Sequence, residues 1–257
     1  MGQSAHLVTR GIVLRETVTK EADKILTLLT EDRGKVPVIA RGVRRKGSRF
    51  AACCQPLVWS EWTLYQRGGW YYVNEGSTLE LFRGLRDNLE AYALASYFAE
   101  LTEAVAEEEV PGPALLRHLL NGLYALSELR KPSELVKPVF ELKLLSLAGY
   151  EPLLDECAYC GKEHPEEPVL DTAQGVLRCK SCGTGNRSTW KPLCAGSLEA
   201  ARRAVYGDER RLYAFTLGED ALRRLDEAVE AFLAVQLERG FRTLEFYKGV
   251  RGSGGNA

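Results

Sequence analysis

Hydrophobic and polar positions alternate over short runs in the first 83 residues, and these runs are rich in β-branched and aromatic side chains. Turn-forming residues such as Arg67-Gly68-Gly69 separate them, a pattern that predicts β-strands. Strands are expected at residues 6–15, 24–30, 35–40, 56–65 and 70–73. Five strands in about 80 residues, without a long helix, favour a small closed barrel. An OB fold is the first interpretation and an SH3-like barrel the second.

The hydrophobic period changes to three and four residues after residue 87, which predicts helices. Helices are expected near residues 89–101, 115–126, 133–148, 197–205 and 219–238. Pro138 leaves two alternatives for the third of these. Either the helix begins at Ser133 and kinks at the proline, or Lys137 caps it and Pro138 takes the first helical position, where no N–H is needed. The second alternative is favoured.

The remaining segments complete an α+β organisation. Phe241–Tyr247 is expected to pack back as an extended piece, and the glycine-rich stretch from Arg251 to Ala257 is expected to be disordered. The predicted parts are an OB-fold DNA-binding domain, a helical domain in two sections, a zinc-binding element between those sections, and a tail. Their bounds are 1–83 for the barrel, 84–154 and 193–250 for the helical domain, 155–192 for the element and 251–257 for the tail.

Four cysteines form two pairs, Cys157-x2-Cys160 and Cys179-x2-Cys182, with 18 residues between the pairs. This spacing is typical of a tetrahedral zinc site, because each two-residue spacer lets a tight turn aim both sulfurs at one point. Gly161 and Gly183 follow the pairs and permit such turns. Two disulfides, free thiols, or His164 in place of one cysteine are the alternatives. Four sulfur ligands leave no open coordination position, so the site is expected to be structural.

Composition places the chain among ordinary globular proteins, at 257 residues with 45% hydrophobic and 27% charged side chains. No apolar run is long enough for a membrane-spanning helix, so no membrane partner is expected. Seven cysteines without an apolar signal segment favour a reducing compartment, with the cytoplasm as the expected location. The net charge of −1 hides an asymmetry. Residues 1–83 hold 13 Lys/Arg and 8 Asp/Glu, a net +5, whereas residues 84–154 hold 6 and 11, a net −5.

The excess positive charge is concentrated between Arg33 and Phe50, which we call the basic segment. It contains seven cations and no acidic residue: Arg33, Lys35, Arg41, Arg44, Arg45, Lys46 and Arg49. Phosphates are the partner that such a run fits, because each neutralised phosphate releases counterions. Arg15, Lys20 and Lys24 could extend the patch. The alternative is an ordinary solvated charged face.

Aromatic residues lie close to the basic segment in the sequence: Phe50, Trp59, Trp62, Tyr65, Trp70, Tyr71 and Tyr72. Single-strand binders combine a basic groove with aromatic platforms, although for any one of these side chains a core position is the more common role. Trp59 and Trp62 should face opposite sides of their strand, so at most one can line a groove. Arg202-Arg203 and Arg223-Arg224 could add phosphate contacts, or could pair with Glu199 and Asp220 one helical turn away.

In this order, barrel, helices and cysteine pairs, the chain resembles the bacterial RecO family of DNA repair proteins, which are recombination mediators. The resemblance covers nearly the whole chain. Its motifs are Gly11-Ile-Val-Leu-Arg15, Glu21-Ala-Asp-Lys24, Gly34-Lys35, Ala40-Arg-Gly-Val-Arg-Arg45, Ser48-Arg-Phe50, Gln55-Pro56, Glu141-Leu-Lys-Leu-Leu145, Gly149-Tyr150, Leu154-Asp155 and the two cysteine pairs. Each motif is weak alone, and the ordered set is specific.

The resemblance implies a non-enzymatic protein that binds single- and double-stranded DNA and anneals complementary strands. It also implies action with RecR, and with RecF, in loading RecA onto strands coated by single-strand-binding protein, and hence a nucleoid-associated location in the cytoplasm. On this chain the implied DNA contacts are Lys35, Arg41, Arg44, Arg45 and Arg49. With the extension of the patch and the rest of the cation run, the candidate set is Arg15, Lys24, Lys35, Arg41, Arg44, Arg45, Lys46 and Arg49.

The resemblance carries two further expectations. The implied zinc ligands are Cys157, Cys160, Cys179 and Cys182, although some family members lack these cysteines. The family also binds the acidic, Phe-ended tail of single-strand-binding protein on its helical domain. Because that domain is net acidic here, a local basic pocket is needed, for which Arg117, Lys137 and Lys143 are candidates.

Two other functional classes fit the sequence less well. An enzyme finds little support, since the three histidines show no useful pairing and the chain has no P-loop, G-x-S-x-G or H-E-x-x-H motif. Cys53, Cys54 and Cys194 are expected to be packed thiols rather than nucleophiles. A zinc-ribbon module that binds only proteins, with no direct DNA role, would explain the cysteines and leave the basic segment without a use.

Overall fold

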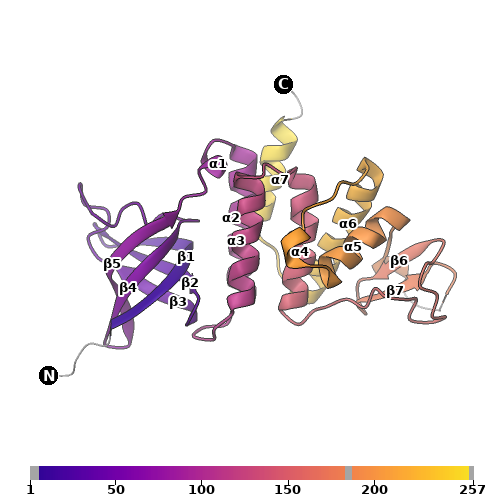
Figure 1. Ribbon diagram of the computed structural model, residues 1–257, viewed down its shortest axis with the longest axis horizontal. Helices are drawn as coiled ribbons and strands as arrows, with labels where there is room; N and C mark the ends of the chain where they lie inside the picture. The colour runs from indigo at the N-terminus through magenta and orange to yellow at the C-terminus, as the bar shows by residue number, and fades with distance from the viewer. Residues whose placement is uncertain (1–5, 183–186, 255–257) are drawn as a thin grey trace. The chain divides into compact units, whose positions relative to one another are not determined.

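The computed structural model describes residues 6–182 and 187–254, which divide into two compact units (Figure 1). The first unit comprises Met1–Glu128 together with Phe241–Ala257, and the second comprises Leu129–Gly240. No helix in the described ranges is long and apolar enough to cross a membrane.

The first unit begins with a closed five-stranded barrel, and all five expected strands are present. The strands are β1 (His6–Thr19), β2 (Asp23–Thr30), β3 (Gly34–Ala40), β4 (Trp59–Arg67) and β5 (Trp70–Glu80). Their order around the barrel is β1-β2-β3-β5-β4, with β4 returning to β1. Among the described barrel strands, β3 and β5 are the one pair that runs parallel. This order and closure are those of an OB fold, so the first interpretation is confirmed and the SH3-like barrel is excluded.

β1 is long because it closes the barrel from both sides. Its first half pairs with β4 and its second half with β2, and a register shift between Val13 and Arg15 lets it bend from one partner to the other. The barrel core consists of inward-facing residues such as Leu26, Val38 and Leu64. Trp62 is fully buried among them and its Nε1 donates to the Gly11 carbonyl at 3.0 Å. Trp59 is only half-buried, as the three-residue spacing predicted.

Three helices follow the barrel: α1 (Arg83–Arg86), α2 (Leu89–Val105) and α3 (Pro113–Ser127). The Asn88 side chain caps α2 by accepting from the backbone N–H of Ala91 at 3.0 Å. Pro113 opens α3 at a position where its missing N–H costs nothing. In the structure α2 packs against α3 and against β1, which attaches the barrel to the helices of the same unit.

The end of the chain differs from the sequence prediction. Residues from Arg242 to Gly254 form helix α7, not an extended piece followed by a disordered tail from Arg251. Phe241, Leu244 and Tyr247 are all buried, and their three-residue spacing gives one helical face, a signal that was present in the sequence. This face packs on α2, where the Phe241 ring meets Tyr97 at a centroid distance of 5.7 Å. Residues 255–257 lie outside the described residues.

The second unit contains helices α4 (Ser133–Leu147), α5 (Ala195–Tyr206) and α6 (Glu219–Leu237), with short 3-10 turns at Arg187–Thr189 and Glu209–Arg211. The favoured prediction for α4 is wrong, since the helix begins at Ser133 and contains Pro138 in its interior. Pro138 removes one backbone hydrogen bond, to the carbonyl four residues earlier. Burial of the side chains on both sides of it, including Val136, Val139 and Phe140, offsets that loss.

A small antiparallel sheet lies between α4 and α5 in the sequence. Its strands are β6 (Pro168–Asp171), β7 (Val176–Cys179) and β8 (Trp190–Pro192), in the order β7-β6-β8. The second cysteine pair begins at the last residue of β7. We call residues 155–192, which hold this sheet and both cysteine pairs, the cysteine element.

Candidate nucleic-acid interface and metal centre

The basic segment runs along β3 and into the loop that connects β3 to β4. Backbone hydrogen bonds hold this loop against the barrel: Arg44 N donates to the Ala22 carbonyl at 3.0 Å, and Gly42 N donates to Asp23 Oδ1 at 2.7 Å. Val43 is buried in the barrel core. The loop is therefore anchored through its backbone and through Val43, while the charged side chains around Val43 extend into solvent.

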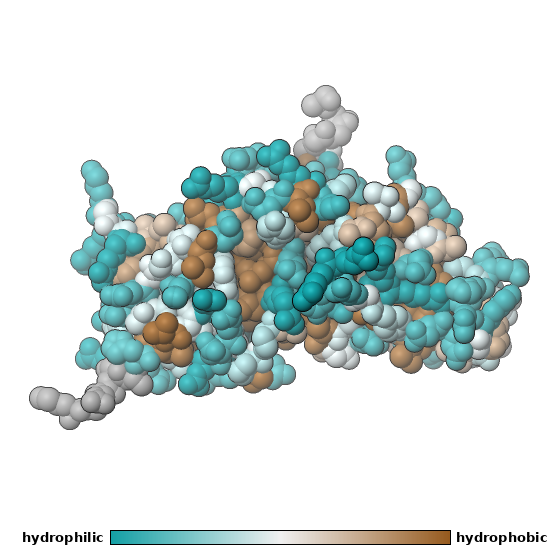
Figure 2. Space-filling model, viewed as in Figure 1, coloured by the Kyte–Doolittle hydropathy of each residue, from teal (hydrophilic) through white to brown (hydrophobic). Residues whose placement is uncertain are grey.

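Five candidate DNA-contact residues are exposed: Arg41, Arg44, Arg45, Lys46 and Arg49. None of them has an ion pair with a carboxylate in the part of the chain that the structure describes. Arg44 donates to the Glu21 carbonyl at 3.1 Å, and Arg49 lies over the Phe50 ring at 4.7 Å. Figure 2 shows the barrel, at the left, as mainly hydrophilic with separate hydrophobic spots. These side chains keep their full charge available for an anionic ligand.

The other three candidates have partners inside the protein. Arg15 forms an ion pair with Glu103 at 2.9 Å, and this hydrogen-bonded contact raises the pKa of Arg15. Lys35 Nζ donates to the Glu103 carbonyl at 2.9 Å. Lys24 pairs with Glu16 at 2.6 Å. Arg15 and Lys35 thus tie the barrel to α2, a role that sequence reasoning missed because the partner is 68 or more residues away.

The metal-centre candidates converge. The Sγ atoms of Cys157, Cys160, Cys179 and Cys182 all lie within 4.8 Å of one another, and those of Cys160 and Cys179 are 3.7 Å apart. Four sulfurs at a zinc–sulfur distance of about 2.3 Å occupy tetrahedron corners about 3.8 Å apart. The donor set therefore fits a tetrahedral thiophilic metal ion. His164 is exposed and is not part of this cluster.

Backbone turns position the sulfurs as the sequence spacing predicted. Gly161 N donates to the Cys157 carbonyl at 2.9 Å and has a φ of 68°, which glycine adopts without strain. Cys182 N donates to the Cys179 carbonyl at 3.0 Å and closes the second turn. The matching expectation for Gly183 lies outside the described residues.

Hydrogen bonds and burial shift the pKa values of Cys157 and Cys179 in opposite directions. Burial opposes ionisation of Cys157, but backbone N–H groups of Tyr159, Cys179 and Cys160 lower its pKa to about 6. Burial, with hydrogen bonds to Cys160 and Cys157, raises the pKa of Cys179 to about 12. A bound metal cation would favour the thiolate form of all four ligands and release their protons.

Arg178 connects the two cysteine turns to the small sheet. It is 1% exposed, forms an ion pair with Asp171 at 2.7 Å, and lies between the rings of Tyr159 and Trp190 at 4.1 Å from each centroid. Its Nε and Nη2 are buried and have no hydrogen-bond partner in the described chain. The guanidinium instead contacts the faces of the two rings. Tyr159 stands between the first two cysteines, so the stack orders that turn.

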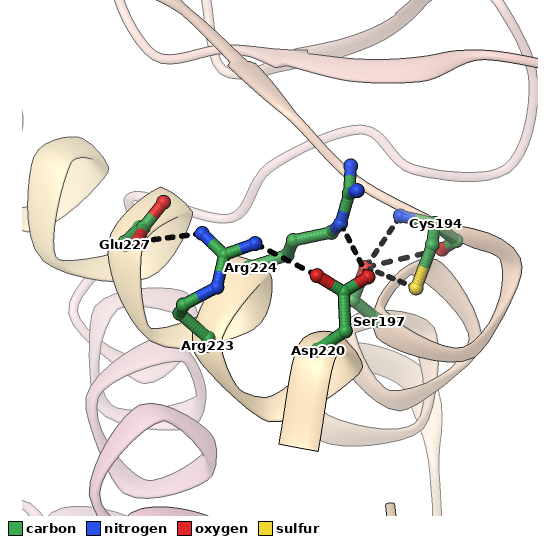
Figure 3. Close-up of polar contacts among 6 residues, drawn as sticks. All are labelled: Cys194, Ser197, Asp220, Arg223, Arg224 and Glu227. Carbon is green, nitrogen blue, oxygen red and sulfur yellow. Dashed lines mark hydrogen bonds and ion pairs between the residues drawn. The ribbon is translucent and has the colours of Figure 1, made fainter. Parts of the chain in front are cut away.

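The arginine pairs of the second unit are used within the protein. Arg202 donates to the carbonyls of Leu154 at 2.9 Å and Asp155 at 2.7 Å, and so fixes the entry into the cysteine element. Arg203 lies over the Phe215 ring at 5.3 Å. Asp220 forms ion pairs with both Arg223 and Arg224 at 2.7 Å. Figure 3 marks these contacts with dashed lines. The pairing of Arg224 with Asp220 is confirmed.

The other three cysteines, which lie outside the metal-centre cluster, are packed in the barrel or cap a helix. Cys53 and Cys54 are buried in the barrel, and the hydrogen bond that the Cys54 thiol donates to Cys53, together with burial, raises the pKa of Cys54. Cys194 caps α5, where its backbone N–H donates to Ser197 Oγ at 2.7 Å (Figure 3).

One of the candidates for a basic pocket on the helical domain is wrong. Lys137 is 2% exposed and is surrounded by three carboxylates, Glu141 at 3.2 Å, Asp226 at 2.7 Å and Glu230 at 3.1 Å. These carboxylates raise its pKa despite burial. Lys137 therefore joins α4 to α6 and is not available to a ligand. Lys143 is half-buried and donates to the Val205 carbonyl at 3.0 Å.

Comparison with known proteins agrees with this architecture. Residues 5–82 match the family described as "Recombination protein O N terminal", and residues 86–245 match "Recombination protein O C terminal". The chain belongs to the RecO family. Among its relatives, DNA repair protein RecO of Symbiobacterium thermophilum is 34% identical, over 94% of this chain and 96% of the relative. DNA repair protein RecO of Acetivibrio thermocellus is 31% identical, over 95% and 96% respectively. Membership of RecO supports a role in DNA repair and recombination.

Proposed function

We propose that this chain is a non-enzymatic DNA-binding mediator of recombinational repair. It binds single- and double-stranded DNA through Arg41, Arg44, Arg45, Lys46 and Arg49. The observation that supports this proposal is five exposed cations on an OB barrel, with no carboxylate paired to them in the described chain. Ordinary surface cations gain modestly from ion pairs with nearby acids, and none of these five has such a partner among the described residues.

Charge alone gives a mechanism for strand annealing. Two DNA strands repel each other, and one cationic surface that contacts both lowers that repulsion. This step needs no nucleophile, general base or open metal position. The protein only has to hold strands without trapping them, and contacts from long, solvated arginine and lysine side chains meet that requirement.

The proposed partners follow from family membership. With RecR, and indirectly RecF and RecA, the protein would help place RecA on DNA coated by single-strand-binding protein, whose acidic tail would contact the helical domain. We also propose that the metal ion of the cysteine element is a single structural zinc. The working location is the cytoplasm, in association with the nucleoid.

The direct test is a salt titration of DNA binding. Reversing the charge of Arg44, Arg45 and Lys46 together should strongly weaken DNA binding and flatten its salt dependence. The double variant Arg44→Ala/Arg45→Ala gives the quantitative measure: loss of two phosphate contacts should reduce the slope of log K against log[salt] by about 1.8 for duplex and about 1.4 for single strands. Unchanged affinity and slope would refute the assignment.

Arg210→Ala/Arg211→Ala is the matched control. These two adjacent arginines are exposed on the 3-10 turn Glu209–Arg211 of the second unit, next to Asp208 and Glu209. Their removal changes the net charge by the same amount and should leave the slope unchanged. Annealing of labelled complementary strands, with and without single-strand-binding protein and RecR, tests the wider proposal. A protein that neither binds nor anneals DNA at low salt would overturn it.

A further inference from the structure

The outer surface of the barrel has one feature that the charged residues do not explain. Five residues, one from each strand, lie opposite one another across the sheet, and we call them the stacking row. The pairing register is Ile25 to Ile39, Ile39 to Tyr72, Tyr72 to Tyr65, and Tyr65 to His6. Directly paired residues share one face of a sheet.

The alternation of the strands shows which face this is. The sequence neighbours Leu7, Leu26, Val38, Leu64 and Val73 all pack in the barrel core. Because successive side chains on a strand point to opposite faces, the stacking row points outward. All five of its residues are half-buried or exposed. A row of two tyrosines and two isoleucines on a solvent-facing surface is more apolar than a barrel exterior requires.

The centre of the stacking row is already arranged as a stack. The rings of Tyr65 and Tyr72 are 5.2 Å apart and inclined by only 17°. The guanidinium of Arg41 lies over the Tyr72 ring at 4.6 Å from its centroid. Arg41 is the first residue of the loop that carries Arg44, Arg45 and Lys46. The aromatic stack and the exposed cations therefore meet at Arg41.

The opposite end of the tyrosine strands has a different character. A groove of about 330 Å³ there is lined by Glu61 and Glu75 together with Arg49 and Phe50. Glu61 and Glu75 offset the positive charge of Arg49 in this groove, so a phosphate backbone is drawn more strongly to the Arg41 end of the row. Charge thus orients the ligand. Tyr65 and the Arg41 guanidinium already contact the Tyr72 ring, so a base would extend the stack on Tyr65 or replace Arg41 on Tyr72.

We propose that Tyr65 and Tyr72, at the centre of the stacking row, form a base-stacking platform that makes this protein distinguish single-stranded from duplex nucleic acid. The inference rests on the proposed function, because the cations bind phosphate in both forms. Only an unpaired strand can place the faces of its bases on tyrosine rings, since a duplex hides those faces in its own stack. The platform adds affinity for single strands alone.

The test compares Tyr65→Leu/Tyr72→Leu with Tyr65→Phe/Tyr72→Phe. Leucine keeps an apolar side chain and removes the ring, whereas phenylalanine keeps the ring. Stacking is worth about 1–3 kcal/mol per base, so the leucine variant should bind a labelled oligothymidine roughly tenfold or more weakly. Its affinity for a duplex of the same length, and the salt slope for both ligands, should not change. The phenylalanine variant should bind like the unaltered protein.

The outcomes separate this inference from the proposed function. Equal weakening for single strands and duplex, or no weakening for either, would overturn the platform. So would a leucine variant that binds single strands normally but no longer forms a complex with RecR, because the row would then be a protein contact. If Arg44→Ala/Arg45→Ala still weakens binding in those cases, the proposed function stands without the platform. If that variant also has no effect, both fail. Thermal unfolding of each variant verifies that the barrel is intact.

Discussion

The barrel and the cysteine element are both small β-structures, but they are stabilised in different ways. Barrel strands are 7 to 14 residues long and enclose a core of side chains with little or no exposure. The element's three strands have 4, 4 and 3 residues. Its buried residues include two of the cysteines, Asp171 and Arg178. A sheet of that size buries little apolar surface alone, so the buried ion pair, and a metal ion if the four cysteines hold one, would add to its stability.

The cations of the two regions also differ in whether they have carboxylate partners. Those of the barrel loop, from Arg41 to Arg49, have no carboxylate partner in the described residues. In the cysteine element Arg178 pairs with Asp171, Lys180 with Glu167 and Lys162 with Glu166. The same residue types thus maintain structure in one region and remain available in the other. The barrel can offer its surface to a ligand because its stability comes from its core.

The largest expected effect is loss of the metal. Cys179→Ser should lower bound zinc from one ion per chain towards none and unfold the cysteine element, because structural zinc contributes about 10–16 kcal/mol in small zinc-binding folds. Hydrogen exchange should rise across residues 155–192 and stay unchanged in the barrel strands, while DNA binding persists. A metal-free element with unchanged protection would show that the sheet does not need the ion.

His164→Ala is the informative control for that measurement. The imidazole lies outside the sulfur cluster, so this variant should keep its zinc. Loss of zinc from His164→Ala alone would contradict the four-cysteine ligand set. Cys194→Ser provides a second control, because it changes a thiol that caps α5 and should leave the metal in place.

Features that depend on local geometry could be predicted from short sequence patterns. Alternation located all five barrel strands, since a closed barrel needs every second side chain inside, and the two-residue spacers located the four sulfurs. The start of α4 was misplaced because the packing of Val136, Val139 and Phe140 outweighs the single hydrogen bond that Pro138 removes. The buried face of α7 was overlooked although its spacing was visible in the sequence.

Long-range partners were beyond such reasoning. Arg15 and Lys35 looked equivalent to Arg44 and Arg45 in the sequence, and only the fold brings Glu103 of α2 to them. Lys137 looked like an available cation and is enclosed by acids from two helices. The stacking row depends on the register of five strands. The Gly68-Gly69 hairpin turn fixes the pairing of Tyr65 with Tyr72, but the pairing of Tyr72 with Ile39 on β3 is long-range.

The second prediction concerns the buried ion pair of the cysteine element. Arg178→Met keeps an unbranched side chain but removes the guanidinium, and it leaves Asp171, which is 4% exposed, without its counter-charge. Removing one partner of a buried pair costs about 3–5 kcal/mol. The loss should appear in this element as weaker retention of zinc against a chelator and faster hydrogen exchange. An unchanged zinc affinity would show that the stack on Tyr159 does not order the metal site.

Two variants sharpen that result. Arg178→Met/Asp171→Leu removes both charges and should restore part of the lost zinc affinity, because no charge is then left buried alone. Glu167→Gln breaks the exposed pair with Lys180, whose side chains are both more than half exposed. Exposed pairs contribute about 0–1 kcal/mol, so this change should hardly alter zinc retention. A large effect of Glu167→Gln would mean that the exposed pair stabilises the element as the buried pair does, whatever its exposure.

The smallest of the three main effects is expected in the barrel. Trp62→Phe keeps an aromatic ring in the core but removes the hydrogen bond from Nε1 to the Gly11 carbonyl and leaves unfilled volume. The expected cost is about 1–3 kcal/mol, since the carbonyl loses a buried donor. Denaturant unfolding followed through the barrel should show this shift, while zinc retention stays unchanged. Arg178→Met should give the reverse result. If either variant changed both measurements equally, the barrel and the cysteine element would share one stability rather than two.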